Sequence, residues 1–478
     1  MAFVPACGFD GMDILRDPVG RRPLSGTFVD QLRALFGERL HLGEAMCLQH
    51  GSSETHFEAM PPDAVVFARS TEEVVALVKL CTTHEVPLIP FGAGTSVEGN
   101  TLAVRGGVSL NLSDMNAIVS VNAEDLDCTV QAGVRREQLN EHLRDQGLFF
   151  PIDPGANATI GGMAATRASG TNAVRYGTMR EAVLSLRVVT PDGRDVRTSR
   201  RARKSAAGYD LTRLMIGSEG TLGIITEVTL RLHGIPEQIS SAVCGFQTLS
   251  GAVDTVVQAI QLGIPLARVE ILDDMQMKAV NRYSKLDYPE VTTLFFEFHG
   301  SPAHVAEQIA LTGELASANG GNEFSWSNLP EERSRLWKAR HDAYYAAVAL
   351  RPGGTGWATD VCVPISRLAQ CISETKADLE ACPVPATILG HVGDGNFHVV
   401  FSIDPDAKDE MRQVEQINTR LVERALGMDG TCTGEHGIGL GKQQWLEAEL
   451  GEAVELMRVI KRALDPKDLF NPGKIFAI

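Results

Sequence analysis

Residues 87–99, PLIPFGAGTSVEG, place a glycine-rich loop directly after a short apolar segment. Residues 87–90 predict a buried strand, so the loop begins where that strand ends. The backbone N–H groups of such loops can cradle phosphates. The glycine spacing G-x-G-x-x-x-x-G departs from the Rossmann pattern, and no Gly-Lys-Ser/Thr is present, so neither a Rossmann nor a Walker loop is indicated. By itself the loop is also compatible with an ordinary turn.

Strand-like and helical segments alternate around this loop. Ser70 opens a capping box before a helix whose apolar face carries Val74, Leu77, Val78 and Cys81. Further helices are expected over residues 28–36 and 135–146, the second ended by Gly147. Strands are expected at residues 65–68, 108–112, 128–133 and 226–232, together with a hairpin of residues 185–190 and 195–198.

Loops of small residues recur through the first half of the chain. They lie at residues 153–165, 169–172, 175–177 and 217–223. Small side chains let the backbone lie close to a large flat ligand. Each loop alone could be a simple connection, but their recurrence indicates one extended ligand held along its length.

Together these loops resemble the FAD-binding domain of the vanillyl-alcohol oxidase / p-cresol methylhydroxylase type. The resemblance implies two small α+β subdomains with FAD between them, and the diphosphate on Gly92, Gly94, Thr95 and Ser96. Residues 90–127 and 143–232 contain no histidine for covalent attachment, so non-covalent FAD is expected. The resemblance also implies cofactor contacts from Pro90, Ala93, Pro154, Gly155, Thr159, Gly161, Gly162, Ala165, Ser169, Gly170, Tyr176, Glu219, Gly223, Ile225 and Asn471.

Beyond Pro236, strand-like runs alternate with helices, which predicts an antiparallel sheet with helices on one of its faces. Among the expected helices is one over residues 331–350, and a long one ends at Leu464. The predicted organisation is an N-terminal segment (1–60), an FAD-binding domain (61–235), a substrate and metal cap (236–470) and a tail (471–478) that returns to the flavin.

Two short glycine-rich segments near the end of the chain concentrate metal-ligating side chains. Residues 390–398 read GHVGDGNFH, and residues 434–437 read GEHG. Apolar runs flank the first segment and predict a hairpin that brings His391 and His398 to one end. Glu435 would complete a set of three ligands, which leaves coordination positions open for catalysis. A lone histidine is more often packed or exposed than a ligand, so the inference depends on the clustering.

The second half resembles the C-terminal domain of FAD-linked D-2-hydroxyacid dehydrogenases, through residues 337–341, 359–364, 390–398, 430–439 and 471–474. The resemblance implies a divalent metal on His391, His398 and Glu435, with His436 as the base. It implies that Arg340 holds the substrate carboxylate and that Asn396 lies near the substrate. His436 follows Glu435 directly, and both can serve only if the turn between Gly434 and Gly437 aims them together. The N/O ligands permit Zn, Mn, Fe or Co, with Zn or Mn expected.

The expected reaction is oxidation of D-lactate, or another small D-2-hydroxy acid, to the 2-oxo acid. His436 would take the hydroxyl proton and hydride would pass to flavin N5. Residues 356–364 favour D-lactate over the alternatives within the class, D-2-hydroxyglutarate dehydrogenase and the FAD subunit of glycolate oxidase. A non-catalytic flavin- or metal-binding subunit is the alternative outside it. No nicotinamide fingerprint is present, and the resemblance implies that the electron acceptor is a quinone, a cytochrome c or an electron-transfer flavoprotein.

Composition limits the partners and the location. The net charge of −16 argues against nucleic acid, and no apolar run approaches the ~20 residues of a membrane span. Nine cysteines without a C-x-x-C pair indicate reduced thiols, and residues 1–13 show no targeting leader. We therefore expect a cytoplasmic protein, with peripheral attachment at the inner membrane and oligomerisation left open.

Overall fold

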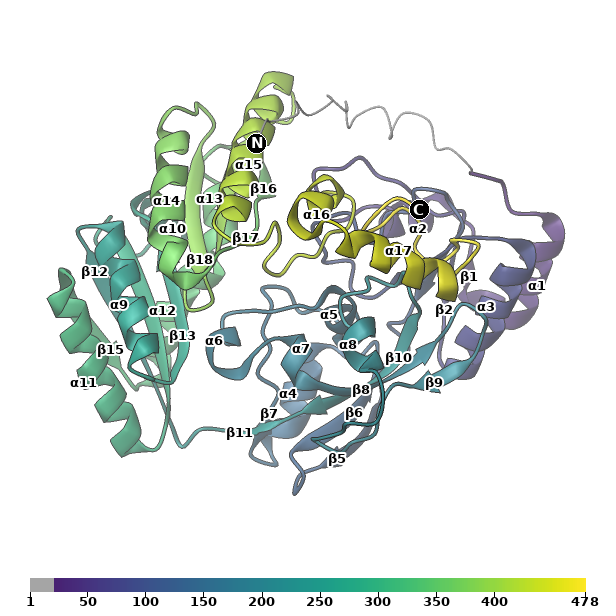
Figure 1. The fold of residues 1–478 in the computed structure, drawn as a ribbon, viewed down its shortest axis with the longest axis horizontal. Helices are drawn as coiled ribbons and strands as arrows, with labels where there is room; N and C mark the ends of the chain where they lie inside the picture. The colour runs from purple at the N-terminus through teal and green to yellow at the C-terminus, as the bar shows by residue number, and fades with distance from the viewer. Residues whose placement is uncertain (1–20) are drawn as a thin grey trace.

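The computed structural model describes residues 21–478, so the start of the predicted N-terminal segment, including residues 1–13, lies outside the described residues. Figure 1 shows the elements of the first half on one side of the molecule and those of residues 236–440 on the other. The last two helices, α16 (Gln443–Leu450) and α17 (Ala453–Leu464), return to the first half. This arrangement confirms the predicted α+β class with a separate C-terminal sheet.

The first sheet of the FAD-binding half carries the glycine-rich loop at the end of one strand. Its order is β1-β2-β4-β3, with β2, β4 and β3 parallel. Helix α3 (Thr71–His84) begins at Ser70, whose hydroxyl accepts from the amide of Glu73, and it buries its predicted apolar face. The remaining elements are α1 (Gly26–Phe36), η1 (Gly37–Arg39), β1 (Leu40–His41), α2 (Glu44–His50), β2 (Ala64–Phe67), β3 (Leu88–Phe91) and β4 (Val108–Asn111).

The second sheet of this half has five antiparallel strands in the order β5-β6-β10-β8-β9. It packs its own apolar cluster beneath short helices that carry the small-residue loops. The elements are β5 (Ile118–Asn122), β6 (Asp127–Gln131), α4 (Arg136–Arg144), β7 (Leu148–Phe149), α5 (Ile160–Thr166), α6 (Ala173–Tyr176), α7 (Met179–Ala182), β8 (Val183–Val189), β9 (Asp195–Arg197), α8 (Leu211–Met215), β10 (Ile224–Arg231) and β11 (His233–Gly234), with β7 pairing β11.

The C-terminal half contains one eight-stranded sheet in which every pairing is antiparallel. Its order is β15-β12-β14-β13-β18-β19-β16, and β17 also pairs β19. The elements are β12 (Gln238–Phe246), α9 (Leu249–Gln261), β13 (Leu266–Leu272), α10 (Asp274–Ser284), β14 (Thr292–Gly300), α11 (Pro302–Ala318), β15 (Gly321–Ser327), α12 (Pro330–His341), α13 (Ala343–Val348), β16 (Thr355–Ala358), β17 (Val361–Cys362), α14 (Ile365–Glu380), β18 (Ala386–His391), β19 (Asn396–Ile403) and α15 (Lys408–Gly427).

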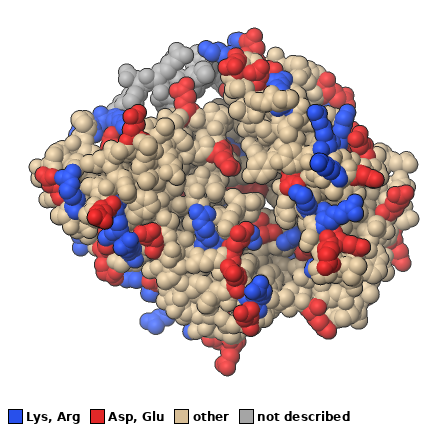
Figure 2. Space-filling view, turned by 180° about the vertical axis from the view of Figure 1, so that it is seen from behind, with Lys and Arg blue, Asp and Glu red and all other residues tan. Residues whose placement is uncertain are grey.

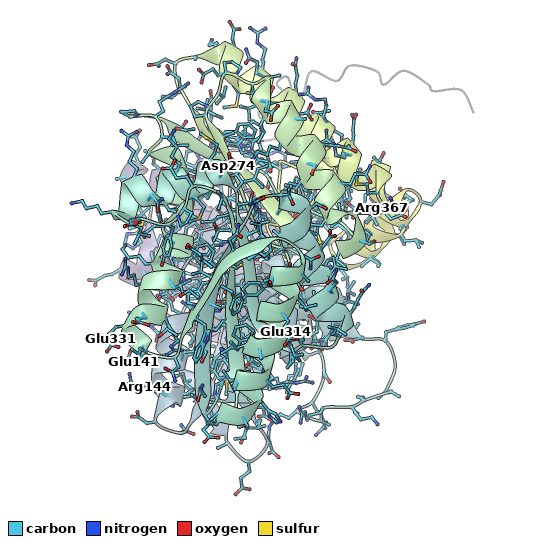
Figure 3. All side chains as sticks on the ribbon, turned by 90° about the vertical axis from the view of Figure 1, so that its left-hand side faces the viewer. Glu141, Arg144, Asp274, Glu314, Glu331 and Arg367 are labelled. Atoms are coloured by element: carbon cyan, nitrogen blue, oxygen red, sulfur yellow. The ribbon has the colours of Figure 1, made fainter. Side chains whose placement is uncertain are left out.

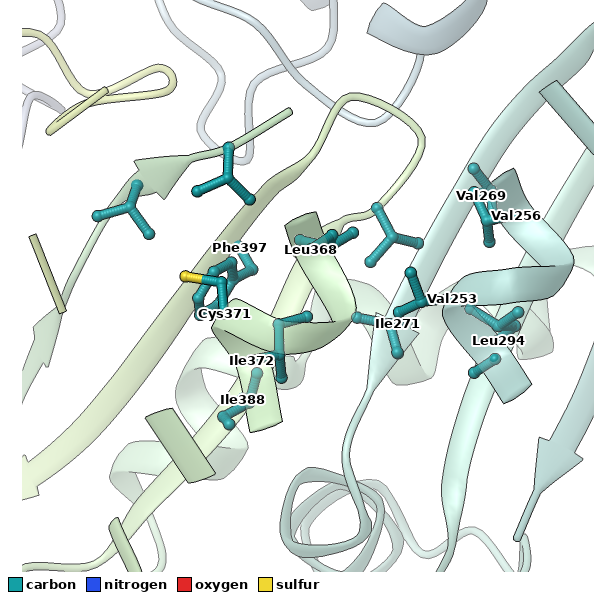
Figure 4. Packing of buried hydrophobic residues seen from close by; sticks show 14 of the residues in the cluster. Val253, Val256, Val269, Ile271, Leu294, Leu368, Cys371, Ile372, Ile388 and Phe397 are labelled. Carbon is teal, nitrogen blue, oxygen red and sulfur yellow. The ribbon is translucent and has the colours of Figure 1, made fainter. Parts of the chain in front are cut away.

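Helices cover both faces of this sheet, which corrects the expectation of helices on one face. In Figure 3, Asp274 of α10 and Glu331 of α12 lie on one side, and Glu314 of α11 and Arg367 of α14 lie on the other. Figure 4 shows the packing on the face of the sheet that α14 covers, where Leu368 of α14 lies close to the strands. Adjacent residues of one strand enter opposite cores, because side chains alternate along a strand.

Two predicted helices are interrupted. The segment 331–350 divides into α12 and α13 at Asp342, whose carboxylate accepts from Ser284 and Lys338. The long helix to Leu464 divides into α16 and α17 at Gly451, whose φ of 52° ends α16. Helical spacing of apolar residues continues across such breaks, so it does not reveal them.

The molecular surface mixes both signs of charge. Figure 2 shows acidic and basic side chains interspersed over one face of the protein. Within residues 21–478, none of the helices combines the length and the apolar character needed to cross a bilayer.

The C-terminal tail closes against the first half of the chain. The backbone N–H of Asn471 donates to Leu88 O (2.9 Å), beside a short parallel bridge between Leu88 and Phe470. The ammonium of Lys474 is buried and donates to Leu102 O at 2.6 Å. The tail therefore fastens the end of the chain beside the glycine-rich loop.

The buried Lys474 predicts a stability that depends on pH. Burial lowers its pKa to about 7, against about 10.4 for an exposed lysine. Between these values the unfolded chain binds more protons than the folded one, so stability rises with pH from about 7 to about 10. We expect Lys474→Met to raise the free energy of unfolding at pH 7 and to lose this advantage near pH 10. Urea unfolding at several pH values measures the effect.

The control for this measurement is Lys467→Met, because Lys467 is an exposed neighbour in the same segment. It should leave the pH dependence as it is in the wild type. Equal dependence of wild type and Lys474→Met on pH would contradict the prediction.

Candidate active site

A cavity of about 750 Å³ lies between the two halves of the molecule. Its size is in the range of cofactor sites. The structure places almost the whole predicted cofactor set in its wall: Pro90, Gly92, Ala93, Gly94, Thr95, Ser96, Pro154, Gly155, Thr159, Gly161, Gly162, Ala165, Ser169, Gly170, Glu219, Gly223, Ile225 and Asn471. Tyr176 is the exception: it lies outside this wall, and its hydroxyl bonds Nδ1 of His299 at 2.8 Å.

Several polar atoms of this wall have no hydrogen-bond partner within residues 21–478. They are Ser96 Oγ, Thr101 Oγ1, Asn100 Oδ1 and Asn471 Oδ1, and all are buried. Leaving a buried polar atom unpaired costs about 1–3 kcal/mol, so several at one site indicate a ligand that supplies the partners. A phosphate- and amide-rich molecule such as FAD offers donors and acceptors of this kind, so the wall fits the cofactor.

Three adjacent strands of the C-terminal sheet present polar side chains to one end of this cavity. Register places Ile271 of β13 opposite Gly390 of β18, and Leu389 of β18 opposite His398 of β19. Because alternate residues share a face, Glu270, His391 and His398 project from the same face of the sheet. The apolar positions between them face the opposite core. The strand pattern therefore turns charged and imidazole groups toward the cavity.

Glu435 meets both imidazoles from a separate turn. Its Oε1 lies 3.2 Å from Nε2 of His391 and 3.4 Å from Nε2 of His398. Nδ1 of His398 faces the carbonyl of Thr359 at 2.9 Å, and Nδ1 of His391 faces Glu270 at 2.7 Å. In a neutral ring with its proton on Nδ1, the lone pair lies on Nε2, and both Nε2 atoms lie beside the Glu435 carboxylate. Three acceptors around one point fit a divalent cation.

Glu270 holds His391 in place and is itself held by Arg340. The carboxylate is fully buried, and Nε of Arg340 donates to its Oε2 at 2.6 Å. Burial alone would raise the pKa of Glu270, but His391 and Arg340 outweigh burial and lower it. Arg340 also lines the cavity, so one guanidinium edge anchors Glu270 while the rest of the group faces the ligand space. A carboxylate behind a ligating histidine fixes the tautomer and orientation of the ring.

We expect Glu270→Gln to weaken divalent metal binding by about 10- to 100-fold, because such outer carboxylates contribute that much to affinity. Titration of Zn²⁺ against a competing chelator measures the change. Glu297→Gln is the matched control, since Glu297 is a buried carboxylate on the neighbouring strand that pairs with His299. Equal affinities for the two variants would show that Glu270 does not support the metal.

His436 lies parallel to His398, with ring centroids 5.2 Å apart and an interplanar angle of 10°. Both Glu435 and His436 line the cavity, so the turn does aim these neighbours to the same side. Asp360 holds the turn in this conformation, because its Oδ2 accepts hydrogen bonds from the backbone N–H groups of Glu435 and His436, both at 3.0 Å. Although burial opposes the charged imidazole, Asp360 and Glu98 raise the pKa of His436.

Asn396 is not among the residues that line the cavity, and its expected place near the substrate stays a prediction. Its amide donates to Asp360 Oδ1 and to Val361 O, both at 2.7 Å. It thus supports Asp360 from behind His391, His398 and Glu435. This position follows from the pairing of β17 with β19, which sets Asn396 opposite Cys362.

Sequence reasoning missed several members of the site. Sequence patterns predicted no role for Glu270 or Asp360, although the two charged residues Arg268 and Glu270 inside the otherwise apolar segment 266–272 are a usable signal. Lys442 is buried between Asp360 Oδ2 and Glu98 Oε1, 3.2 Å from each. Although burial favours the neutral acid, Lys442 and His436 hold the pKa of Asp360 well below its usual range. These groups come from distant segments, so spacing could not bring them together.

Comparison with known families and proteins agrees with this geometry. Residues 62–199 match the FAD binding domain family, and residues 235–475 match the C-terminal domain of FAD linked oxidases. The solved p-cresol methylhydroxylase has the same fold, with a TM-score of 0.76 over 96% of this chain and 99% of that one at 17% identity.

Two relatives with known names identify the family more closely. A probable mitochondrial D-lactate dehydrogenase of Danio rerio is 54% identical, over 94% of this chain and 92% of its own length. A mitochondrial D-lactate dehydrogenase [cytochrome] of Arabidopsis thaliana is 47% identical, over 94% and 79%. Both are mitochondrial, so the expectation of a cytoplasmic protein is wrong. With this identity and both family matches, the chain belongs to the FAD-linked D-lactate dehydrogenases of the cytochrome type, and it shares the fold of p-cresol methylhydroxylase.

Proposed function

We propose that this protein oxidises D-lactate to pyruvate with non-covalent FAD and a divalent metal, Zn²⁺ or Mn²⁺, held by His391, His398 and Glu435. The observation that carries the proposal is that the three ligands and the FAD-type loops line one cavity. We also propose the division into an FAD-binding domain (61–235), a cap (236–470) and a tail (471–478). No cysteine lines the cavity among residues 21–478, which supports non-covalent binding.

The protein's own residues supply substrate binding and proton transfer. Arg340 faces the cavity beside the metal ligands, and its guanidinium suits a carboxylate. His436 takes the hydroxyl proton at its ring nitrogen, since imidazole is an effective base near neutral pH. His391, His398 and Glu435 would hold the divalent ion and the glycine-rich cavity wall would hold FAD; together these groups would supply Lewis acidity at the hydroxyl and a hydride acceptor.

The lining favours a short monocarboxylate over a diacid. Near the metal ligands it includes the apolar residues Ala358, Leu389 and Val400. Arg268 also lines the cavity, but it is committed to Asn172 (3.1 Å) and Asp153 (3.2 Å). Arg136 also lines the cavity and pairs with Glu137 at 3.4 Å, and no lysine lines it among residues 21–478, so a second carboxylate would find little compensation. This supports D-lactate over D-2-hydroxyglutarate.

We propose a cytochrome as the electron acceptor, because the relatives of this type carry that designation. A quinone or an electron-transfer flavoprotein is the alternative.

Steady-state turnover with a dye acceptor tests the substrate. We expect D-lactate to be oxidised at least about tenfold more efficiently than D-2-hydroxyglutarate, which is the discrimination that one unpaired charge can supply. L-lactate should give no turnover above background. Strong activity with the diacid and none with D-lactate would reject the proposal, and replacing the dye by cytochrome c tests the acceptor.

A further inference from the structure

The turn that carries Glu435 and His436 is held by two buried carboxylates, one from each half of the molecule. Asp360 of the C-terminal half accepts the amides of Glu435 and His436. Glu219 of the FAD-binding half accepts the amide of Ile438 on Oε1 (2.8 Å) and that of Gly439 on Oε2 (2.9 Å). The amides on both sides of Gly437 are therefore fixed by groups far away in the sequence.

Glu219 also belongs to the wall of the flavin cavity. Its backbone has a φ of 51°, in the left-handed region that few residues other than glycine adopt. Asn100 donates to its carboxylate at 2.6 Å, and Asn471 donates to its carbonyl at 2.7 Å. A non-glycine residue stays in this region only where its surroundings determine it strongly. The side-chain oxygens of Asn100 and Asn471 are buried in the cavity wall and have no hydrogen-bond partner in the part of the chain that the structure describes.

We propose that Glu219 is a positioning residue that couples flavin binding to metal binding; this inference depends on the flavin and metal sites of the proposed function. A ligand in the cavity would order Asn100, Asn471 and the Glu219 backbone. Glu219 would in turn order the turn that carries the ligand Glu435. Ordering by one ligand lowers the entropic cost of binding the second. By linkage, FAD tightens metal binding and the metal tightens FAD binding by the same factor.

Asp360 acts on the same turn without this coupling. It is fully buried in the C-terminal half and is held by Asn396 and Lys442. It does not line the cavity. Asp360 therefore holds the turn that carries Glu435 whether or not the cavity is occupied, whereas Glu219 holds this turn more firmly when a ligand occupies the cavity.

The test compares the Zn²⁺ affinity of flavin-free and FAD-loaded protein, measured against a competing chelator. In the wild type we expect FAD to tighten Zn²⁺ binding by about tenfold, within the usual range for coupled sites. In Glu219→Gln the ratio should fall to near one, because the amide side chain has one acceptor oxygen in place of two. Asn100→Ala, which removes a donor to Glu219, should lower the ratio as well.

Glu227→Gln is the matched control. Glu227 is a buried carboxylate of the same half that pairs with Arg187 and Arg197, and this variant should keep the wild-type ratio. A ratio of one in the wild type, or an undiminished ratio in Glu219→Gln, would overturn the coupling. A protein that binds no Zn²⁺ with or without FAD would overturn the metal site itself, so the two failures are distinguishable.

Discussion

We expect the replacement of His398 by alanine to lower kcat/KM for D-lactate by at least about a thousandfold. A bound divalent metal would contribute several kcal/mol to stabilising the charge that develops on the substrate oxygen, and each 1.36 kcal/mol corresponds to a factor of about ten. His398 can supply that ligand only through Nε2, because Nδ1 is bound to the carbonyl of Thr359. Steady-state kinetics with a dye acceptor, together with metal analysis of the purified protein, measures both losses.

The control is His304→Ala on the exposed surface of α11, which should keep full activity and metal content. FAD content separates a specific effect from unfolding, since His398→Ala should still bind the flavin. An active variant that lacks metal would contradict the assignment of His398.

We expect the replacement of His436 by alanine to lower kcat by about 10²- to 10⁴-fold, the usual contribution of a positioned base. The metal should remain bound, because His391, His398 and Glu435 are unchanged and Asp360 still holds the backbone of the turn. KM should change little, since Arg340 still faces the cavity. Stopped-flow flavin reduction, with metal analysis on the same sample, distinguishes this variant from His398→Ala.

Added imidazole provides the internal check on His436→Ala. A small base that enters the space left by the missing ring should restore part of the flavin reduction rate, whereas it should not rescue His398→Ala. Unchanged reduction without His436, in the absence of any added base, would remove its role as the proton acceptor.

Local sequence patterns predicted the strands around the glycine-rich loop, the capping of α3 at Ser70 and the approach of the two histidines, because each depends on nearby residues. They did not predict Glu270 behind His391, since that contact requires β13 to pair with β18, more than a hundred residues later. They also did not predict the contact between Asp360 and the turn that carries Glu435, because these two segments are far apart in the sequence. Register between distant strands is set by the whole sheet and not by local spacing.

Two other differences have simple causes. The run Leu294-Phe295-Phe296 is apolar without alternation, which is typical of a strand buried on both faces, and both faces are indeed covered. Tyr176 lies in a loop of the FAD-type set, yet its side chain turns away to His299 in the other half. A loop pattern predicts the path of the backbone, while the direction of a long side chain depends on partners from elsewhere in the fold.

The central claim is that a metal held by His391, His398 and Glu435 serves a flavin in the same cavity. Anaerobic addition of D-lactate to the FAD-loaded protein tests it directly, by following the loss of the yellow flavin absorbance. We expect rapid bleaching by D-lactate, none by L-lactate, loss of bleaching after chelation and recovery on adding Zn²⁺ or Mn²⁺. Flavin that stays oxidised with D-lactate in metal-replete protein, or bleaching that is unaffected by complete metal removal, would contradict the account.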